Sequence, residues 1–131
     1  MKQTIYFNCF YVIMMIISSC NDSNNQEKVI PEIHSKKAIK LFNNENYLFL
    51  DVRTYEEHQK LSIPNTMVIP IQDLASTIDE LQHYKDKEII VYCRSGNRSK
   101  KGTQILIKNG FKAHNMIGGM KEWNGPIEKS N

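Results

Sequence analysis

The segment Cys93-Arg94-Ser95-Gly96-Asn97-Arg98-Ser99 combines a thiol, two permanent positive charges and a glycine. Gly96 allows the backbone to curl so that successive N–H groups point into one concavity. A helical pattern follows from about Ser99, and a helix adds the positive end of its dipole at its N-terminus. We therefore expect Cys93 at the rim of an anion-binding bowl, with a pKa well below the free value of about 8.5 and a thiolate as its resting form.

The chain around this loop alternates short apolar runs with helical patterns, which predicts an α/β domain with a mainly parallel central sheet flanked by helices. Strands are expected at 47–50, ending at Asp51, and at 67–71, 88–92 and 113–117. Pro70 interrupts the second run, so that strand should end early or lie near an edge. In open sheets of this class ligands bind at the carboxyl ends of strands, which is where the Cys93 loop stands.

Local signals predict where several helices begin and end. Ser35 is a plausible N-cap for a first helix, and Thr54 with Glu57 three residues later matches a capping box. A further helical stripe is formed by apolar residues at spacing i, i+4, i+7: Leu74, Ile78 and Leu81. Gly110 suits the left-handed position after the helix that begins near Ser99. Trp123 should fill the core from a terminal helix.

The first twenty residues have the character of a targeting segment. Lys2 precedes an apolar run from Ile5 to Ile17, which is too short for a comfortable spanning helix of about 20 residues but suits a secretory signal peptide. The run ends in Ile17-Ser18-Ser19-Cys20, which resembles a bacterial lipoprotein signal. The resemblance implies removal of residues 1–19, with Cys9 among them, and lipidation of Cys20. The alternative is an uncleaved anchor in which Cys20 is incidental.

Residues 20–28 are polar and lack apolar anchors, so they predict a flexible tether ahead of a domain at residues 29–131. Lipid chains on Cys20 would hold this domain at a membrane surface. We therefore expect secretion across the inner membrane and anchoring at the cell envelope, on the periplasmic side or at the outer membrane. Asn21 does not match the aspartate of the best-known inner-membrane retention signal, so the choice of membrane stays open.

Composition and cysteine count exclude several classes. The 131 residues carry 17 basic and 14 acidic side chains, a net charge of +3, which is too mild to indicate a nucleic-acid binder. Cys93 is the single cysteine of the domain, so no internal disulfide is expected. The histidines show no ligand spacing with one another or with Cys93, which disfavours zinc, and no cofactor is expected. They are His34, His58, His83 and His114.

Four sequence elements, in order, resemble the rhodanese domains, and the likeness runs from about Ile30 to Trp123. The segment from Cys93 to Ser99 resembles the active-site loop of that family. The other elements are Asp51-Val52-Arg53 with Glu56-Glu57, Ile63-Pro64 with Val68-Ile69-Pro70, and Gly118-Gly119-Met120-Lys121-Glu122-Trp123. The resemblance implies a rhodanese-like fold.

The resemblance also implies a sulfurtransferase. Cys93 would take sulfane sulfur from thiosulfate or a similar anionic donor, hold it as a persulfide and pass it to a thiol or cyanide, with a protein acceptor also possible. The surrounding substrate-binding loop would be Arg94, Ser95, Gly96, Asn97, Arg98 and Ser99. Arg94 would attract the donor, and Arg98 would tie the loop to the sheet. Asp51 and Arg53 are expected as a structural ion pair that supports the loop.

Two other functions stay open. A non-catalytic rhodanese-like binding or scaffold module at the cell envelope would keep the fold without the chemistry. A thiol-dependent phosphatase or arsenate reductase of related fold uses five residues between cysteine and arginine, whereas four separate Cys93 from Arg98. The chain also departs from the usual Gly-His-Ile-Pro-Gly-Ala at Leu61-Ser62 and Asn65-Thr66, and it carries His58 where an aromatic residue is usual. These departures leave acceptor preference open.

Overall fold

The computed structural model of the protein describes residues 29–130. The predicted signal segment, the lipidation of Cys20 and the tether at residues 20–28 lie outside the described residues. The elements are, in chain order, β1 (Glu32–His34), α1 (Ser35–Ala38), the 3-10 helix η1 (Ile39–Leu41), β2 (Tyr47–Asp51), α2 (Tyr55–Lys60), β3 (Met67–Val68), α3 (Ile71–Leu74), the 3-10 helix η2 (Ile78–Tyr84), β4 (Glu88–Tyr92), α4 (Asn97–Lys108), β5 (Lys112–Ile117) and α5 (Gly119–Glu122).

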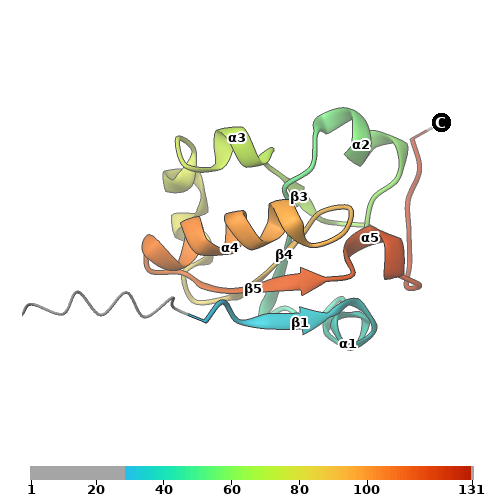
Figure 1. Cartoon of the computed structure of the whole chain (residues 1–131), viewed down its shortest axis with the longest axis horizontal. Helices are drawn as coiled ribbons and strands as arrows, with labels where there is room; N and C mark the ends of the chain where they lie inside the picture. Colours follow the sequence, from blue (N-terminus) through green and yellow to red (C-terminus); the bar gives the residue numbers. More distant parts are fainter. Residues whose placement is uncertain (1–28, 131) are drawn as a thin grey trace, which may run out of the picture.

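A five-stranded sheet in the order β1-β5-β4-β2-β3 forms the centre of the molecule, and every adjacent pair is parallel. This confirms the α/β class with a parallel sheet (Figure 1). β4 lies in the middle, and its residues Ile89, Ile90 and Val91 are fully buried because both faces of the sheet are covered. β3 is a two-residue edge strand that ends before Pro70, as its sequence predicts.

Each face of the sheet has its own apolar core. On one face Leu50, Val91 and Leu106 belong to a cluster that includes residues from α3, η2 and α4. On the other face α1 and η1 pack with Trp123, which is 8% exposed. Trp123 meets Phe49 edge-to-face, with ring centroids 5.9 Å apart, which confirms its predicted place in the core. Alternate residues of β2 and β4 point to opposite cores, since side chains alternate along a strand.

Two helix predictions are wrong in detail. The N-cap of α1 is His34, whose Nδ1 accepts from the N–H of Lys36, while Ser35 is the first helical residue. The Ser35 hydroxyl is buried and donates instead to the carbonyls of Ile117 and Gly119, at 3.0 and 2.9 Å. Two tertiary acceptors, at the end of β5 and the start of α5, therefore take the hydroxyl away from the local cap.

The stripe of Leu74, Ile78 and Leu81 does not lie on one continuous helix, because α3 ends at Leu74 and η2 begins at Ile78. The hydroxyls of Ser76 and Thr77 donate to the carbonyl of Asp73, at 2.8 and 3.0 Å. Such local bonds compete with the hydrogen bonds of a regular helix. Leu74 and Leu81 are nevertheless fully buried in the same cluster, as the stripe implies.

Candidate active site

Cys93 follows β4 directly, at the sheet edge where the carboxyl ends of the parallel strands meet. The backbone N–H of Gly96 donates to Sγ of Cys93 at 3.1 Å. Gly96 has φ +109° and is the N-cap of α4, so the left-handed turn that aims this N–H at sulfur requires a glycine. α4 begins at Asn97, two residues earlier than its sequence pattern indicates, and this brings its first turn over the thiol.

The environment of Cys93 favours the thiolate. Burial is the largest single contribution and on its own raises the pKa of the thiol, because a charged sulfur loses its solvation. Hydrogen bonds outweigh it: the Ser99 hydroxyl and the backbone N–H groups of Ser99, Gly96 and Ser95 bring the pKa of Cys93 below its ordinary value. The residue is only 1% exposed, so it forms the floor of the bowl and not the rim that the sequence predicts.

A chain of buried polar groups runs from Cys93 into the sheet. Sγ of Cys93 lies 3.4 Å from Oγ of Ser99, and either atom can be the donor. The Ser99 hydroxyl donates to Oδ1 of Asn115 at 2.6 Å. Asn115 lies on β5 and is 2% exposed. Sequence reasoning missed Asn115; the signal that could have found it is an amide at a buried position of a predicted strand.

α5 forms a second wall of the loop. The backbone N–H groups of Met120 and Lys121 donate to the carbonyls of Cys93 and Arg94, at 2.9 and 3.0 Å. At Gly119 a Cβ atom would lie 2.5 Å from the carbonyl oxygen of Cys93, which is closer than any side chain tolerates. The absence of a side chain at Gly119 therefore lets α5 approach the backbone of the thiol residue.

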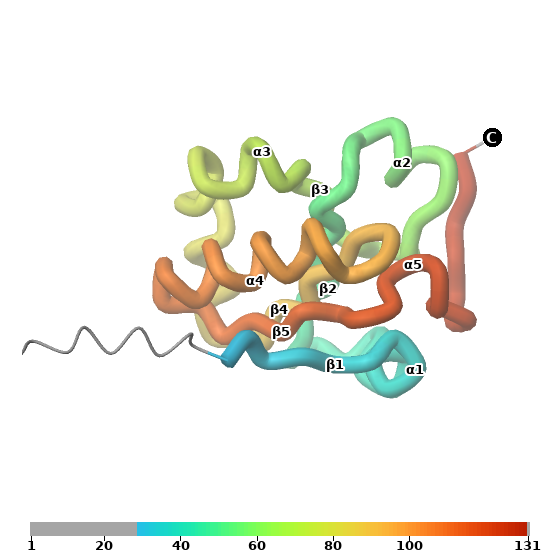
Figure 2. The backbone as a smooth tube through the Cα atoms, viewed as in Figure 1, coloured from blue at the N-terminus to red at the C-terminus, as the bar shows by residue number. Residues whose placement is uncertain are grey.

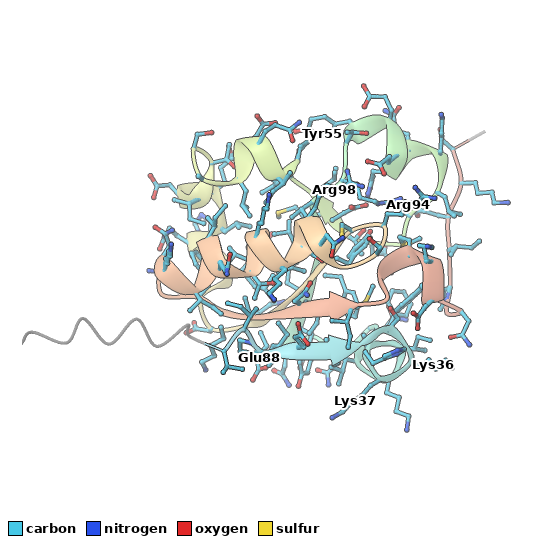
Figure 3. The ribbon with its side chains drawn as sticks, viewed as in Figure 1. Lys36, Lys37, Tyr55, Glu88, Arg94 and Arg98 are labelled. Carbon is cyan, nitrogen blue, oxygen red and sulfur yellow. The ribbon has the colours of Figure 1, made fainter. Side chains whose placement is uncertain are left out.

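Arg98 makes its ion pair with α2, which corrects the prediction that it ties the loop to the sheet. Its two terminal nitrogens donate to the two carboxylate oxygens of Glu57 at 2.7 and 2.8 Å. These hydrogen bonds, acting against partial burial, lower the pKa of Glu57 to about 2. Glu57 also completes the predicted capping box with Thr54. Arg94 is exposed and lies, like Arg98, near the start of α4 (Figure 3).

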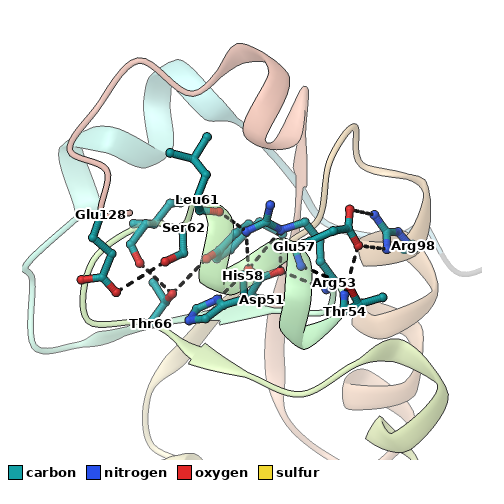
Figure 4. A network of polar contacts seen from close by, with 12 residues as sticks. Asp51, Arg53, Thr54, Glu57, His58, Leu61, Ser62, Thr66, Arg98 and Glu128 are labelled. Carbon is teal, nitrogen blue, oxygen red and sulfur yellow. Dashed lines mark hydrogen bonds and ion pairs between the residues drawn. The ribbon is translucent and has the colours of Figure 1, made fainter. Parts of the chain in front are cut away.

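The expected ion pair of Asp51 and Arg53 is present and buried. Asp51 is fully buried and Arg53 is 5% exposed, and their closest charged atoms are 2.7 Å apart. Nδ1 of His58 lies 2.9 Å from the same carboxylate oxygen, and Arg53 also donates to the carbonyl of Leu61 at 2.7 Å (Figure 4). The Arg53 guanidinium lies over the ring of Tyr92, 5.7 Å from its centroid. This network therefore contacts the residue immediately before Cys93.

The positions that depart from the family pattern make contacts of their own. Thr66 lies 2.9 Å from the hydroxyl of Tyr92 and donates to the carbonyl of Ile63. Ser62 exchanges two backbone hydrogen bonds with Glu128, which belongs to the segment after α5. That segment runs back alongside α2 (Figure 2). The departures thus lie in the segment that follows β2 and outside the turn from Cys93 to Ser99.

In the part of the chain that the structure describes, no histidine is hydrogen-bonded to Cys93, whose sulfur contacts Ser99 and Gly96. His34, His58 and His114 each contact one carboxylate, of Glu122, Asp51 and Glu88 respectively. Within residues 29–130 no group of three or more His, Cys, Asp and Glu side chains is arranged to hold a metal ion. No helix in that range has the length and apolar character that crossing a membrane demands.

Comparison with known proteins agrees with the geometry of the loop. Residues 34–126 match the family model described as Rhodanese-like domain. The chain belongs to the rhodanese-like domain family. It is also 36% identical over 109 residues to "Putative sulfur carrier protein YrkF" of Bacillus subtilis (strain 168). That alignment covers 81% of this chain and 57% of the relative, so the chain spans little more than half the length of that protein.

Solved structures confirm the rhodanese-like fold. The crystal structure of a rhodanese-like domain protein from Staphylococcus aureus superposes with a TM-score of 0.68 at 29% identity, covering 78% of this chain and 100% of that one. The thiosulfate sulfurtransferase of Pseudomonas aeruginosa matches with a TM-score of 0.69 at 25% identity, covering 78% of this chain and 21% of that one. The chain is thus a rhodanese-like domain whose relatives include proteins named for carrying or transferring sulfur.

Proposed function

We propose that the protein is a sulfurtransferase that carries sulfane sulfur as a persulfide on Cys93. The observation that carries the proposal is the hydrogen bond from the Gly96 N–H to Sγ at 3.1 Å, in a turn that lowers the pKa of the thiol. A thiolate is the nucleophilic form of cysteine, so Cys93 needs no separate general base. The membership of the family and its sulfur-carrying relatives support the same chemistry.

In the proposed first step the Cys93 thiolate attacks the outer sulfur of thiosulfate. A bond forms between the two sulfur atoms, the sulfur–sulfur bond of the donor breaks, and sulfite leaves with the electron pair. An acceptor thiolate or cyanide then attacks the outer sulfur of the persulfide and restores the Cys93 thiolate. The backbone N–H groups around Sγ would stabilise the anion in both steps, as an oxyanion hole does for oxygen. Arg94 would attract the anionic donor.

The test is to incubate the full chain with thiosulfate, digest it and weigh the peptide that contains Cys93. We expect a gain of one sulfur atom that dithiothreitol removes. Cys93→Ala should abolish the gain, whereas Cys20→Ser, which changes a cysteine outside the domain, should leave it intact. If neither thiosulfate nor polysulfide adds sulfur to Cys93, the proposed function is wrong. Release of phosphate from an aryl phosphate would instead support the phosphatase alternative.

One observation favours a second candidate function. Cys93 is 1% exposed, and a buried thiol is what a non-catalytic binding or scaffold module would retain as packing. The reactivity of the thiol separates the two functions. A sulfurtransferase should lose its free Cys93 thiol to iodoacetamide within minutes at neutral pH, whereas a packing cysteine should react only when the protein is unfolded.

We further propose that Cys20 is lipidated after removal of residues 1–19 and that the domain is held at a membrane surface of the cell envelope. The support is the sequence alone, in the order apolar run, two serines and cysteine. The mass of the N-terminal peptide of the mature protein, isolated from a bacterial membrane fraction, tests this. A peptide that begins at Cys20 with added acyl chains is expected, and an unmodified Met1 peptide would rule the anchor out.

A further inference from the structure

The polar chain behind Cys93 contains one hydroxyl proton that two acceptors compete for. Ser99 Oγ lies 2.6 Å from Oδ1 of Asn115 and 3.4 Å from Sγ of Cys93. All three residues are at most 2% exposed, so solvent does not supply a replacement partner. A serine hydroxyl has a single proton to donate, whereas the asparagine carboxamide presents an acceptor on one side and two donors on the other.

The direction of these bonds can change with the charge on sulfur, because either atom of the Cys93–Ser99 pair can be the donor. With a neutral thiol, the S–H donates to Oγ of Ser99 and the Ser99 O–H donates to Oδ1 of Asn115. After ionisation the thiol proton has passed to solvent, and sulfur can only accept. The Ser99 O–H then donates to sulfur, which leaves Oδ1 of Asn115 facing an oxygen with no proton between them. A half-turn of the carboxamide restores the bond, because Nδ2–H then donates to Oγ of Ser99.

We propose that Asn115 is a positioning residue for Cys93, which acts through Ser99 and turns its carboxamide so that the hydroxyl faces either the thiol or the thiolate. The proposal rests on the proposed sulfur chemistry at Cys93 and adds a residue from β5 to it. The oxygen and the NH2 group of an asparagine carboxamide are similar in size, so the side chain can turn over and present either the acceptor or the donor to Ser99. A residue that only accepts would hold the Ser99 proton away from sulfur.

Charged groups on the elements around Cys93 also affect its ionisation. The variants below change only Asn115 and Ser99, so these native charged groups stay in place. Arg98, paired with Glu57, is attracted to the thiolate. The other charged or titratable groups on the loops after β2 and β4 and on β2, α2, α4 and α5 are Tyr47, Asp51, Arg53, Tyr55, Glu56, His58, Lys60, Arg94, Lys100, Lys101, Lys108, Lys121 and Glu122. None of them takes part in the hydrogen bonds between Ser99 and Asn115.

The decisive variant is Asn115→Asp in the full chain. An aspartate carboxylate accepts only, so the Ser99 hydroxyl must donate to it and cannot donate to sulfur. The rate of alkylation of the Cys93 peptide by iodoacetamide, followed by mass spectrometry from pH 4 to 10, reports the midpoint of ionisation. We expect the midpoint to rise by at least about one pH unit, with alkylation about tenfold slower below it.

Two further variants separate the proposed role from charge and packing effects. Asn115→Ala removes the acceptor and leaves the Ser99 hydroxyl free for the thiolate, so the midpoint should not rise. Asn115→Asp in a Ser99→Ala background should shift the midpoint much less than it does beside Ser99. An equal shift in both backgrounds would mean that the carboxylate acts directly on sulfur. A rise in the alanine variant equal to that in the aspartate variant would mean lost packing. Either result overturns the proposal.

A measurement on the unmodified protein does not depend on whether a variant folds. The side-chain amide protons of Asn115 should change chemical shift in NMR spectra with the midpoint found for Cys93 by alkylation. The backbone amide of Gly96, which donates directly to sulfur, is the positive control. A Gly96 signal that titrates while the Asn115 side chain stays constant would overturn the proposal.

These experiments and the sulfur-loading experiment can fail separately. Alkylation and chemical shifts report the ionisation of Cys93 without any sulfur donor, whereas the mass gain reports transfer. If Cys93 takes up sulfur but the Asn115 variants and the Asn115 amide signals show no effect, the proposed function stands and the role of Asn115 is refuted. A responsive Asn115 without sulfur loading would do the reverse.

Discussion

Two segments follow two neighbouring strands of the sheet, β4 and β2, and they hold their shape in different ways. The turn from Cys93 to Ser99 after β4 is built from backbone N–H groups, with the φ of +109° at Gly96 as its key feature. The segment from Asp51 to Thr66 after β2 is built from charged and hydroxyl side chains that bond one another and Tyr92. Arg98 and Glu57 connect the two.

The difference shows which changes each segment can accept. In the turn, Arg94, Ser95 and Asn97 are exposed, and the hydrogen bonds to sulfur come from backbone N–H groups and the Ser99 hydroxyl, so these three side chains can change without altering those bonds. In the segment from Asp51 to Thr66, called the support below, contacts between side chains hold the backbone in place, and Asp51 and Arg53 are buried. The departures from the usual family pattern fall in the support, at residues such as His58 and Thr66. We therefore expect changes in the support to alter stability more than chemistry, and changes at the turn to do the opposite.

Asp51→Asn should have the largest effect, and on stability. It leaves the buried Arg53 without a counter-charge, and breaking a buried pair costs about 3–5 kcal/mol. The free energy of unfolding in urea measures this, while sulfur loading of the molecules that remain folded should be close to normal. Asp86→Asn, at an exposed carboxylate, is the control and should stay within about 0.5 kcal/mol. A loss below about 1 kcal/mol for Asp51→Asn would contradict a structural role for the pair.

Gly119→Ala should have the next largest effect, and on chemistry. The new Cβ would lie 2.5 Å from the carbonyl of Cys93 and must displace the backbone of the turn. A displacement of about 1 Å at a reacting group can cost about 100-fold, so persulfide formation in stopped-flow measurements should slow by that order. Gly110→Ala is the matched control, since Gly110 also has positive φ but only Lys85 Nζ within 4 Å of the added atom. Equal rates for the two variants would show that the close approach of α5 to Cys93 does not matter for the reaction.

Glu57→Gln should weaken the connection between the two segments by a smaller amount. Both partners are about one-third exposed, so solvent screens the pair and we expect a loss of about 1 kcal/mol at neutral pH. Because the pKa of Glu57 is lowered from 4.5 to about 2, its stabilising effect is full above about pH 4.5 and disappears as pH falls towards 2. Urea unfolding between pH 7 and 2 should show the wild type and the variant converging.

The control for Glu57→Gln is Glu56→Gln, which removes the same charge from an exposed neighbour in the first turn of α2. The Glu56 variant should differ little from the wild type at every pH. A pH-independent difference between the Glu57 variant and the wild type would show that the ion pair with Arg98 is not its cause.

Arg94→Ala should have the smallest effect, and only on the encounter with the donor. The exposed guanidinium attracts an anion through solvent, and salt screens such an attraction. The reaction with thiosulfate should slow several-fold at about 0.01 M salt and much less near 1 M. Lys108→Ala removes an equal charge at the far end of α4 and should change the rate little. If the two variants share one salt dependence, Arg94 does not steer the donor.

The parts of the fold that were predictable depend on short-range patterns. The strand from Glu88 to Tyr92, the capping box of Thr54 and Glu57, the helix end at Gly110 and the early end of β3 before Pro70 are all as expected. Each arises from the residues within a few positions of it. The prediction of an N-cap at Ser35 was wrong because the Ser35 hydroxyl donates to carbonyls more than 80 positions away.

The sequence by itself determined the chemistry of the candidate site, because a thiol, a glycine and the start of a helix lie within seven positions and need no distant partner to form the turn. Only the tertiary structure decided what stands around that turn: Glu57 opposite Arg98, Gly119 against the Cys93 carbonyl, and Asn115 behind Ser99. These contacts join elements from different strands and helices. Which side chains meet there depends on the order and register of the sheet, and those are set by packing of the whole core.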